Sequence, residues 1–63
     1  MSQSDMILAH LKRHNSITAV QALGRYGVFR LAARIGDLRD KGYIIETETI
    51  HRDKKHYARY WLA

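Results

Sequence analysis

Residues 27–43 constrain the fold more than any other segment, because their apolar positions repeat with the period of a helix. Leu31, Ile35 and Leu38 fall on one face of such a helix. Ala33 and Gly36 fall toward the other side, where small residues allow a close approach to another surface. We therefore expect a helix over residues 29–41 that is buried on one side and ends at the following glycine.

A first helix is expected over residues 3–13. Ser2 and Asp5 have the spacing of a capping box, in which each side chain bonds the backbone N–H of the other residue. The apolar residues at positions 7, 8 and 11 then form a helical stripe.

A second, short helix is expected over residues 19–23. Thr18 and Gln21 have the spacing of another capping box. Gly24 is expected to end this helix, because glycine readily takes the left-handed conformation found after a helix. Residues 24–27, bracketed by glycines, then form a tight turn before the third helix.

After Gly42 the pattern becomes that of β-strands. Residues 43–50 are rich in β-branched side chains, residues 56–62 are rich in aromatic ones, and the charged residues 51–55 are expected to form the turn. Adjacent strands with a short connection pair antiparallel, and such a hairpin needs the helices beneath it for stability. Residues 16–17 can add a short third strand.

The expected core combines the apolar faces of these elements. Of the last strand, Tyr60 and Leu62 are expected to face the helices, which leaves Tyr57 and Trp61 partly exposed. Phe29 is either a core plug or an exposed contact for a thymine methyl group, and the plug is the favoured interpretation. The full set of expected core residues is Ile7, Leu8, Leu11, Ile17, Ala22, Leu23, Val28, Leu31, Ile35, Leu38, Ile44, Tyr60 and Leu62.

Three helices followed by a β-hairpin describe an α+β, mostly helical, winged helix-turn-helix, here expected as one domain over residues 1–63. Within residues 17–44 the chain has Gly27-Val28, then Arg-Leu-Ala-Ala-Arg-Ile from position 30, Asp-Leu-Arg from position 37, and Gly42-Tyr43. In these residues it resembles a family of short helix-turn-helix domains common in phages and prophages. The resemblance implies a winged helix-turn-helix fold and a DNA-binding role.

The charge of the chain favours a polyanionic partner. Eleven Lys and Arg residues against six Asp and Glu residues give a net charge of +5, and the isoelectric point is near 10.0. Residues 25–41 carry five basic and two acidic side chains, and residues 51–60 carry four basic and one acidic. The positive charge is therefore gathered in the third helix and the hairpin rather than spread evenly.

Double-stranded DNA is the expected partner, with the third helix in the major groove and the hairpin on the sugar-phosphate backbone. Arg30 and Arg34, four residues apart, repel each other unless they contact phosphate or guanine. The alternative is that Asp37 neutralises Arg34 and also pairs with Lys41, which makes this flank a solvated charge network. The expected DNA-binding residues are Arg25, Tyr26, Arg30, Ala33, Arg34, Asp37, Arg52, Lys54 and Lys55.

Other classes of function find little support in the sequence. The chain has no cysteine, so we expect neither disulfides nor thiolate metal sites. His10 and His14 have a spacing that can hold a metal, but no third ligand is evident, and both are expected to be exposed. We expect no enzyme activity, cofactor, small-molecule ligand, signal peptide or membrane span, and a cytoplasmic location.

Two rival interpretations remain open. A protein-interaction module of the same fold, such as a phage-encoded inhibitor or adaptor, would use the basic face or Tyr57 and Trp61 as anchors for a host protein. Alternatively, the aromatic strand would stack single-stranded bases. If DNA is the partner, either a homodimer or binding together with a partner is expected, because one module of this size has a limited contact area.

Overall fold

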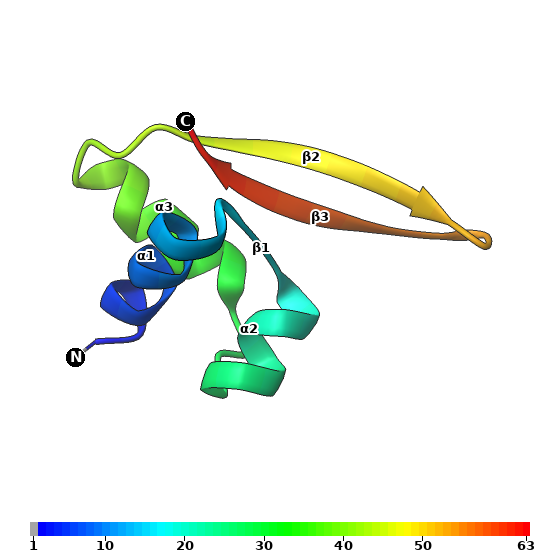
Figure 1. Ribbon diagram of the computed structural model, residues 1–63, viewed down its shortest axis with the longest axis horizontal. Coiled ribbons are helices and arrows are strands. Elements are labelled where there is room, and N and C mark those ends of the chain that lie inside the picture. The colour runs from blue at the N-terminus through cyan, green and yellow to red at the C-terminus, as the bar shows by residue number, and fades with distance from the viewer. Residues whose placement is uncertain (1) are drawn as a thin grey trace.

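The computed structural model describes residues 2–63, which form three helices and a three-stranded antiparallel sheet (Figure 1). The elements in chain order are α1 (Gln3–His14), β1 (Ser16–Thr18), α2 (Ala19–Tyr26), α3 (Leu31–Asp40), β2 (Ile45–Arg52) and β3 (Lys55–Leu62). The predicted order of three helices followed by a hairpin is confirmed, and residues 16–17 do belong to a short first strand.

Both predicted capping boxes are present. The Ser2 hydroxyl accepts from the Asp5 N–H at 3.1 Å, and Asp5 Oδ2 accepts from the Ser2 N–H at 3.3 Å. These bonds favour the carboxylate and hold the pKa of Asp5 below its ordinary value. Thr18 and Gln21 make the equivalent pair of bonds at the start of α2. Local sequence alone therefore sets where these two helices begin.

The predicted end of the second helix is wrong. α2 continues through Gly24 to Tyr26, and the left-handed residue that caps it is Gly27, with φ of +67°. The added turn is stabilised by tertiary contact, because the Tyr26 hydroxyl lies 2.8 Å from His10 Nδ1 in α1. The connection to α3 is therefore residues 27–30 rather than 24–27.

The third helix is shorter than predicted at its start. It begins at Leu31, and Arg30 is its N-cap residue with no side-chain capping bond. Phe29 therefore lies in the connection that precedes the helix. At the C-terminal end of α3, Gly42 follows the last turn and has φ of +100°. The prediction that this helix ends at Gly42 is thus confirmed.

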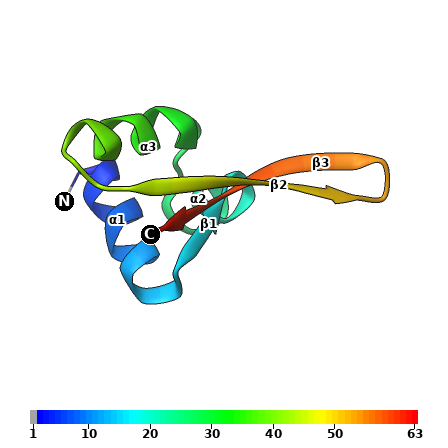
Figure 2. The ribbon, with the colours of Figure 1, turned by 90° about the horizontal axis from the view of Figure 1, so that it is seen from above.

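The sheet has β3 in its centre, between β1 and β2. In the register, Tyr60 is opposite both Ile17 of β1 and Thr47 of β2. β2 and β3 each continue for eight residues, so the hairpin projects well beyond the helices (Figure 1, Figure 2). Both strands are longer toward the tip than predicted, and only Asp53 and Lys54 form the turn.

One apolar cluster joins the elements beneath the sheet. Its buried members are Ile7, Leu11, Ile17, Ala22, Val28, Leu31, Ile35, Leu38 and Ile45, and Leu8, Tyr60 and Leu62 pack against it, half-buried. Most of the predicted core is confirmed. Among residues 2–63, no helix has the length and apolar character that crossing a bilayer requires.

Three of the predicted core assignments are wrong. Ile44 is 71% exposed, and its neighbour Ile45, opposite Leu62 in the register, is buried in its place. Leu23 is 46% exposed, and Phe29 is 85% exposed instead of plugging the core. Successive residues of a β-strand point to opposite faces of the sheet. An error of one residue in the predicted register therefore places Ile44 instead of Ile45 on the buried face.

Candidate nucleic-acid interface

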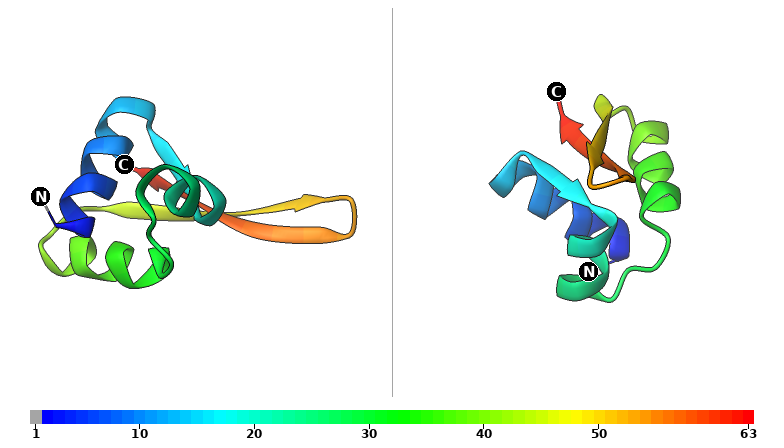
Figure 3. Two further views of the ribbon diagram at one scale, coloured as in Figure 1. Left: turned by 90° about the horizontal axis from the view of Figure 1, so that it is seen from below. Right: turned by 90° about the vertical axis from the view of Figure 1, so that its right-hand side faces the viewer.

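The outer surface of α3 is open and flat at its N-terminal end. Leu31, Ile35 and Leu38 are buried, whereas Ala32 and Ala33 on the first turn are exposed. Seen from the hairpin end, α3 and β1 lie on opposite sides of the hairpin (Figure 3). The helix therefore presents small side chains, Ala33 among them, on a surface that the rest of the chain leaves uncovered.

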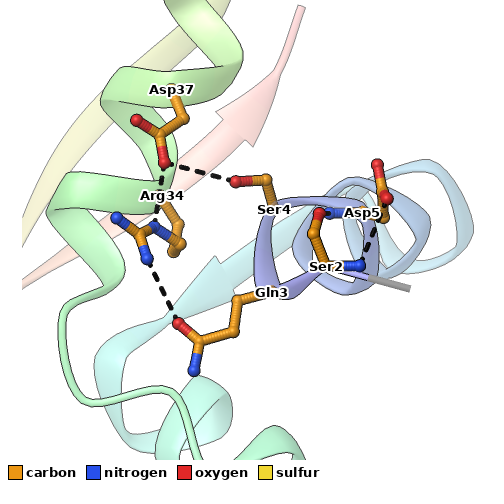
Figure 4. A network of polar contacts seen from close by, with 6 residues as sticks. All are labelled: Ser2, Gln3, Ser4, Asp5, Arg34 and Asp37. Carbon is orange, nitrogen blue, oxygen red and sulfur yellow. Dashed lines mark hydrogen bonds and ion pairs between the residues drawn. The ribbon is translucent and has the colours of Figure 1, made fainter.

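Arg34 and Asp37 point toward α1 and form a polar network with its first turn (Figure 4). Arg34 Nε lies 3.0 Å from Asp37 Oδ2, and Arg34 Nη1 donates to Gln3 Oε1 at 3.3 Å. The Ser4 hydroxyl donates to the same Asp37 oxygen at 3.4 Å. The pairing of Asp37 with Arg34, the alternative raised from the sequence, is present, whereas no ion pair joins Asp37 to Lys41 in the described part of the chain.

Arg30 differs from Arg34 in its surroundings. It lies just before α3, is exposed, and makes no side-chain hydrogen bond or ion pair with any residue from 2 to 63. The prediction that both arginines share one flank of a helix is therefore wrong, because Arg30 is not within the helix. Its guanidinium group can bind a phosphate or a base edge without first breaking an internal contact.

An open groove lies between the start of α3 and the middle of β3. Its walls include Ala19, Phe29, Arg30, Ala33, Ala58 and Tyr60. The α3 end that borders this groove is the one nearer the projecting hairpin (Figure 1, Figure 2). The groove thus connects the first turn of α3 to the strand that leads to the hairpin tip.

The hairpin tip gathers three exposed cations. Arg52 and Lys55 are opposite each other in the register, and Lys54 lies in the turn. Asp53 and Lys54 have φ of +48° and +66°, the left-handed pair that a two-residue hairpin turn requires. Like charges that are directly opposite destabilise a strand pair, so a polyanion that binds here would relieve their repulsion.

Arg25 and Tyr26 belong to the last turn of α2 and not to a loop, which corrects their predicted position. Arg25 is exposed, so its guanidinium group is accessible. Tyr26 is half-buried, and its hydroxyl is in contact with His10. Tyr26 therefore has a structural role between α1 and α2 that the sequence did not reveal.

His10 is only 4% exposed, which corrects the prediction of an exposed residue. Its ring lies 4.6 Å from the His14 ring, centroid to centroid, and 5.6 Å from the ring of Tyr26. Burial, followed by the nearby His14 and Arg25, lowers the pKa of His10 below its ordinary value. No group of three His, Asp or Glu side chains within residues 2–63 could hold a metal ion.

The half-buried Trp61 of β3 makes contacts within the hairpin. Trp61 Nε1 donates to Glu48 Oε1 at 3.1 Å, and the Arg59 guanidinium carbon lies 5.6 Å from the centre of the Trp61 ring. A nucleobase stacked on Trp61 would have to displace these contacts. This face therefore suits single-stranded bases less well than the sequence suggested.

Phe29 is the groove residue whose exposure sequence reasoning missed. It lies in the connection before the N-cap residue Arg30, so the helical period does not fix the direction of its side chain. The preference for burying a phenylalanine in so short a chain led to the wrong assignment.

The comparisons with known proteins agree with this architecture. Residues 2–63 match the family model described as a winged helix-turn-helix domain. No curated protein matches significantly, and no solved structure does. The family match covers all the described elements, so the β2–β3 hairpin is the wing, and α3 is the second helix of the helix-turn-helix motif. The chain therefore belongs to the family of winged helix-turn-helix domains.

Proposed function

We propose that this protein binds double-stranded DNA with the N-terminal end of α3 in the major groove and the wing on the sugar-phosphate backbone. Winged helix-turn-helix domains are typically DNA-binding, non-enzymatic modules. The observation that best supports this arrangement is the open groove beside Arg30, because it joins the first turn of α3 to the strand that leads to Lys54 and Lys55.

The charges along α3 favour its N-terminal end over its C-terminal end. In the second half of the helix, the carboxylates of Asp37 and Asp40 are offset by Arg39 and by Lys41 at the C-cap. At the start of the helix, Arg30 and the positive end of the helix dipole add to each other, so phosphates are attracted to the start of α3 more strongly than to its end. In this arrangement Ala33 faces the base edges, while Arg30 and the wing cations contact phosphates.

Within this function, we assign the predicted site residues unequal roles. Arg30, Arg52, Lys54 and Lys55 are the main phosphate contacts, and Arg25 is an additional one from α2. Arg34 and Asp37 act mainly by fixing α3 against α1, and Tyr26 by fixing α2. We further propose that the protein is a phage or prophage transcriptional regulator that acts in the cytoplasm as a homodimer.

The direct test is the binding of a mixed-sequence 20-base-pair duplex, followed by fluorescence anisotropy over a range of salt concentrations. If the five assigned cations of a bound chain each contact a phosphate, the logarithm of the binding constant should fall against the logarithm of salt with a slope of about −4.5. Arg30→Ala and Lys54→Ala should each weaken binding and reduce the slope by about 1.

Arg13→Ala is the matched control for these substitutions. It removes the same charge from an exposed position in the last turn of α1, at the other end of that helix from Gln3, which contacts Arg34 of α3. Its effect on duplex binding should be clearly smaller than that of Arg30→Ala. Equal effects of the three substitutions would show that net charge alone, and not this surface, attracts the DNA.

A second candidate function is the binding of a host protein. Two exposed apolar side chains favour it, because Val20 on α2 is 80% exposed and Phe29 is 85% exposed. Under this hypothesis the purified protein has no salt-dependent affinity for duplex DNA, and Arg30→Ala and Lys54→Ala leave that result unchanged. The same anisotropy experiment therefore decides between the two functions.

A further inference from the structure

The side chain of Phe29 is presented to solvent at the place where the proposed interface begins. It is 85% exposed, and it lines the groove together with Arg30, Ala32 and Ala33. The two alanines are themselves exposed on the first turn of α3. Phe29, Ala32 and Ala33 thus form one apolar surface, which we call the Phe29 surface, with a free guanidinium group beside it.

The Phe29 surface requires a partner that combines an apolar group with negative charge. Its groove contains one cation, Arg30, and no carboxylate. Of the groups that base pairs expose in the major groove, the C5 methyl of thymine is the apolar one, and phenylalanine and alanine are among the side chains that contact it. A thymine with its neighbouring phosphates therefore matches both parts of the surface.

We propose that Phe29, supported by Ala33, reads the C5 methyl group of a thymine and makes the protein select thymine at that position. This inference rests on the proposed function and adds a specificity-determining residue to it. Arg30 would hold the phosphate next to the selected base, while Phe29 covers its methyl group. Shielding the exposed ring from water on binding supplies the preference.

Deoxyuridine tests the proposal, because it differs from thymidine only by the missing methyl group. Duplexes are first selected by the wild-type protein from a pool with about 14 randomised base pairs, the size of a short site. Each thymine of the selected duplex is then replaced singly by uracil. We expect replacement of the contacted thymine, of which a homodimer has one in each half-site, to weaken wild-type binding about fourfold, the factor for removing one methyl group from an apolar contact.

The variant Phe29→Ala completes a double-mutant cycle. It should bind the selected thymine duplex more weakly than the wild type does. Its affinity should not decrease further when uracil replaces thymine at the same position. Because Phe29 is exposed, its removal should leave the thermal unfolding midpoint unchanged. Ile44→Ala, which truncates another exposed apolar side chain beyond the far end of α3, is the control and should keep the uracil effect.

Two results would overturn the inference while leaving duplex binding intact. One is wild-type binding that no uracil replacement weakens, and the other is Phe29→Ala being as sensitive to uracil as the wild type. A protein with no salt-dependent affinity for any duplex would instead overturn the proposed function and this inference together. Phe29 would then be assigned to a protein partner.

Discussion

Arg30 and Arg34 are four residues apart, yet only one of them is committed to contacts within the protein. Arg34 is held by Asp37 and by Gln3, which is 31 residues away in the sequence. Arg30 has no comparable partner among residues 2–63. The same residue type therefore serves packing at one position and is available for recognition at the other.

This difference predicts opposite outcomes for the two alanine variants. Arg34→Ala should lower the free energy of unfolding by about 0.5 kcal/mol, the usual worth of a partly exposed ion pair, with little effect on duplex affinity. Arg30→Ala should weaken duplex binding and leave stability unchanged. Urea unfolding and anisotropy measure the two effects, and a larger loss of affinity for Arg34→Ala would contradict the assignment.

His10 predicts how stability depends on pH. Burial and the positive charge of His14 and Arg25 lower its pKa in the folded protein, whereas the unfolded chain takes up this proton near the ordinary value of about 6.5. Since the unfolded state binds more protons, the free energy of unfolding should fall as pH decreases from 7 to 5. One proton limits this contribution to about 1.4 kcal/mol per pH unit.

Two variants separate burial from hydrogen bonding in this effect. His10→Leu should remove this contribution to the pH dependence, measured by urea unfolding at several pH values. Tyr26→Phe removes the hydroxyl next to His10 Nδ1 but keeps the ring that buries it, so it should retain most of the dependence. If His10→Leu left the dependence unchanged, another group would have to be its source.

At the scale of the elements, the wing turn combines conformational strain with positive charge. Lys54 has φ of +66°, a conformation that costs a non-glycine residue about 1 kcal/mol. Lys54→Gly should therefore raise the free energy of unfolding by up to about 1 kcal/mol and, by removing a cation from the wing, weaken duplex binding. Thermal unfolding and anisotropy measure the two changes.

Lys54→Ala is the control for the wing turn. It removes the same charge but keeps a Cβ at the left-handed position, so it should weaken duplex binding without the gain in stability expected for glycine. Lys54→Gly binding DNA as tightly as the wild type would show that the charge at this position has no part in recognition.

The elements also show what the sequence could and could not predict. The capping boxes at Ser2 and Thr18 were found correctly because a capping box is set by residues three apart. The end of α2 was missed because Gly24 and Gly27 are equally suited to end a helix, and the contact of Tyr26 with His10 in α1 decides between them. Ile44 and Ile45 are likewise equivalent until Leu62 sets the register.

The sequence predicts which segments form the candidate site, but not which contacts their side chains make. The basic residues cluster in α3 and the wing, and this clustering can be read from the sequence alone. The engagement of Arg34 with Gln3 depends on how α3 packs against α1, and the exposure of Phe29 depends on where α3 begins. Such relations between distant segments determine which of several suitable side chains remain free.

At the scale of the whole molecule, one module offers a small surface for reading DNA, which is the reason for proposing a homodimer. Sequences selected from the random pool should then be inverted repeats with half-site centres about 10 base pairs, or one helical turn, apart. Sedimentation of the complex should give two protein chains per duplex. A single non-repeated site bound by one chain would exclude the dimer.

The central place of β3 in the sheet has a consequence for biosynthesis. β1 and β2 do not pair with each other, and each bonds only to β3, which follows both in the chain. While a ribosome is still translating the codons for residues 55–62, the emerging polypeptide holds two strands without their shared neighbour. Sheet closure must therefore wait until that last strand has cleared the exit tunnel, so the helices are the first elements free to associate.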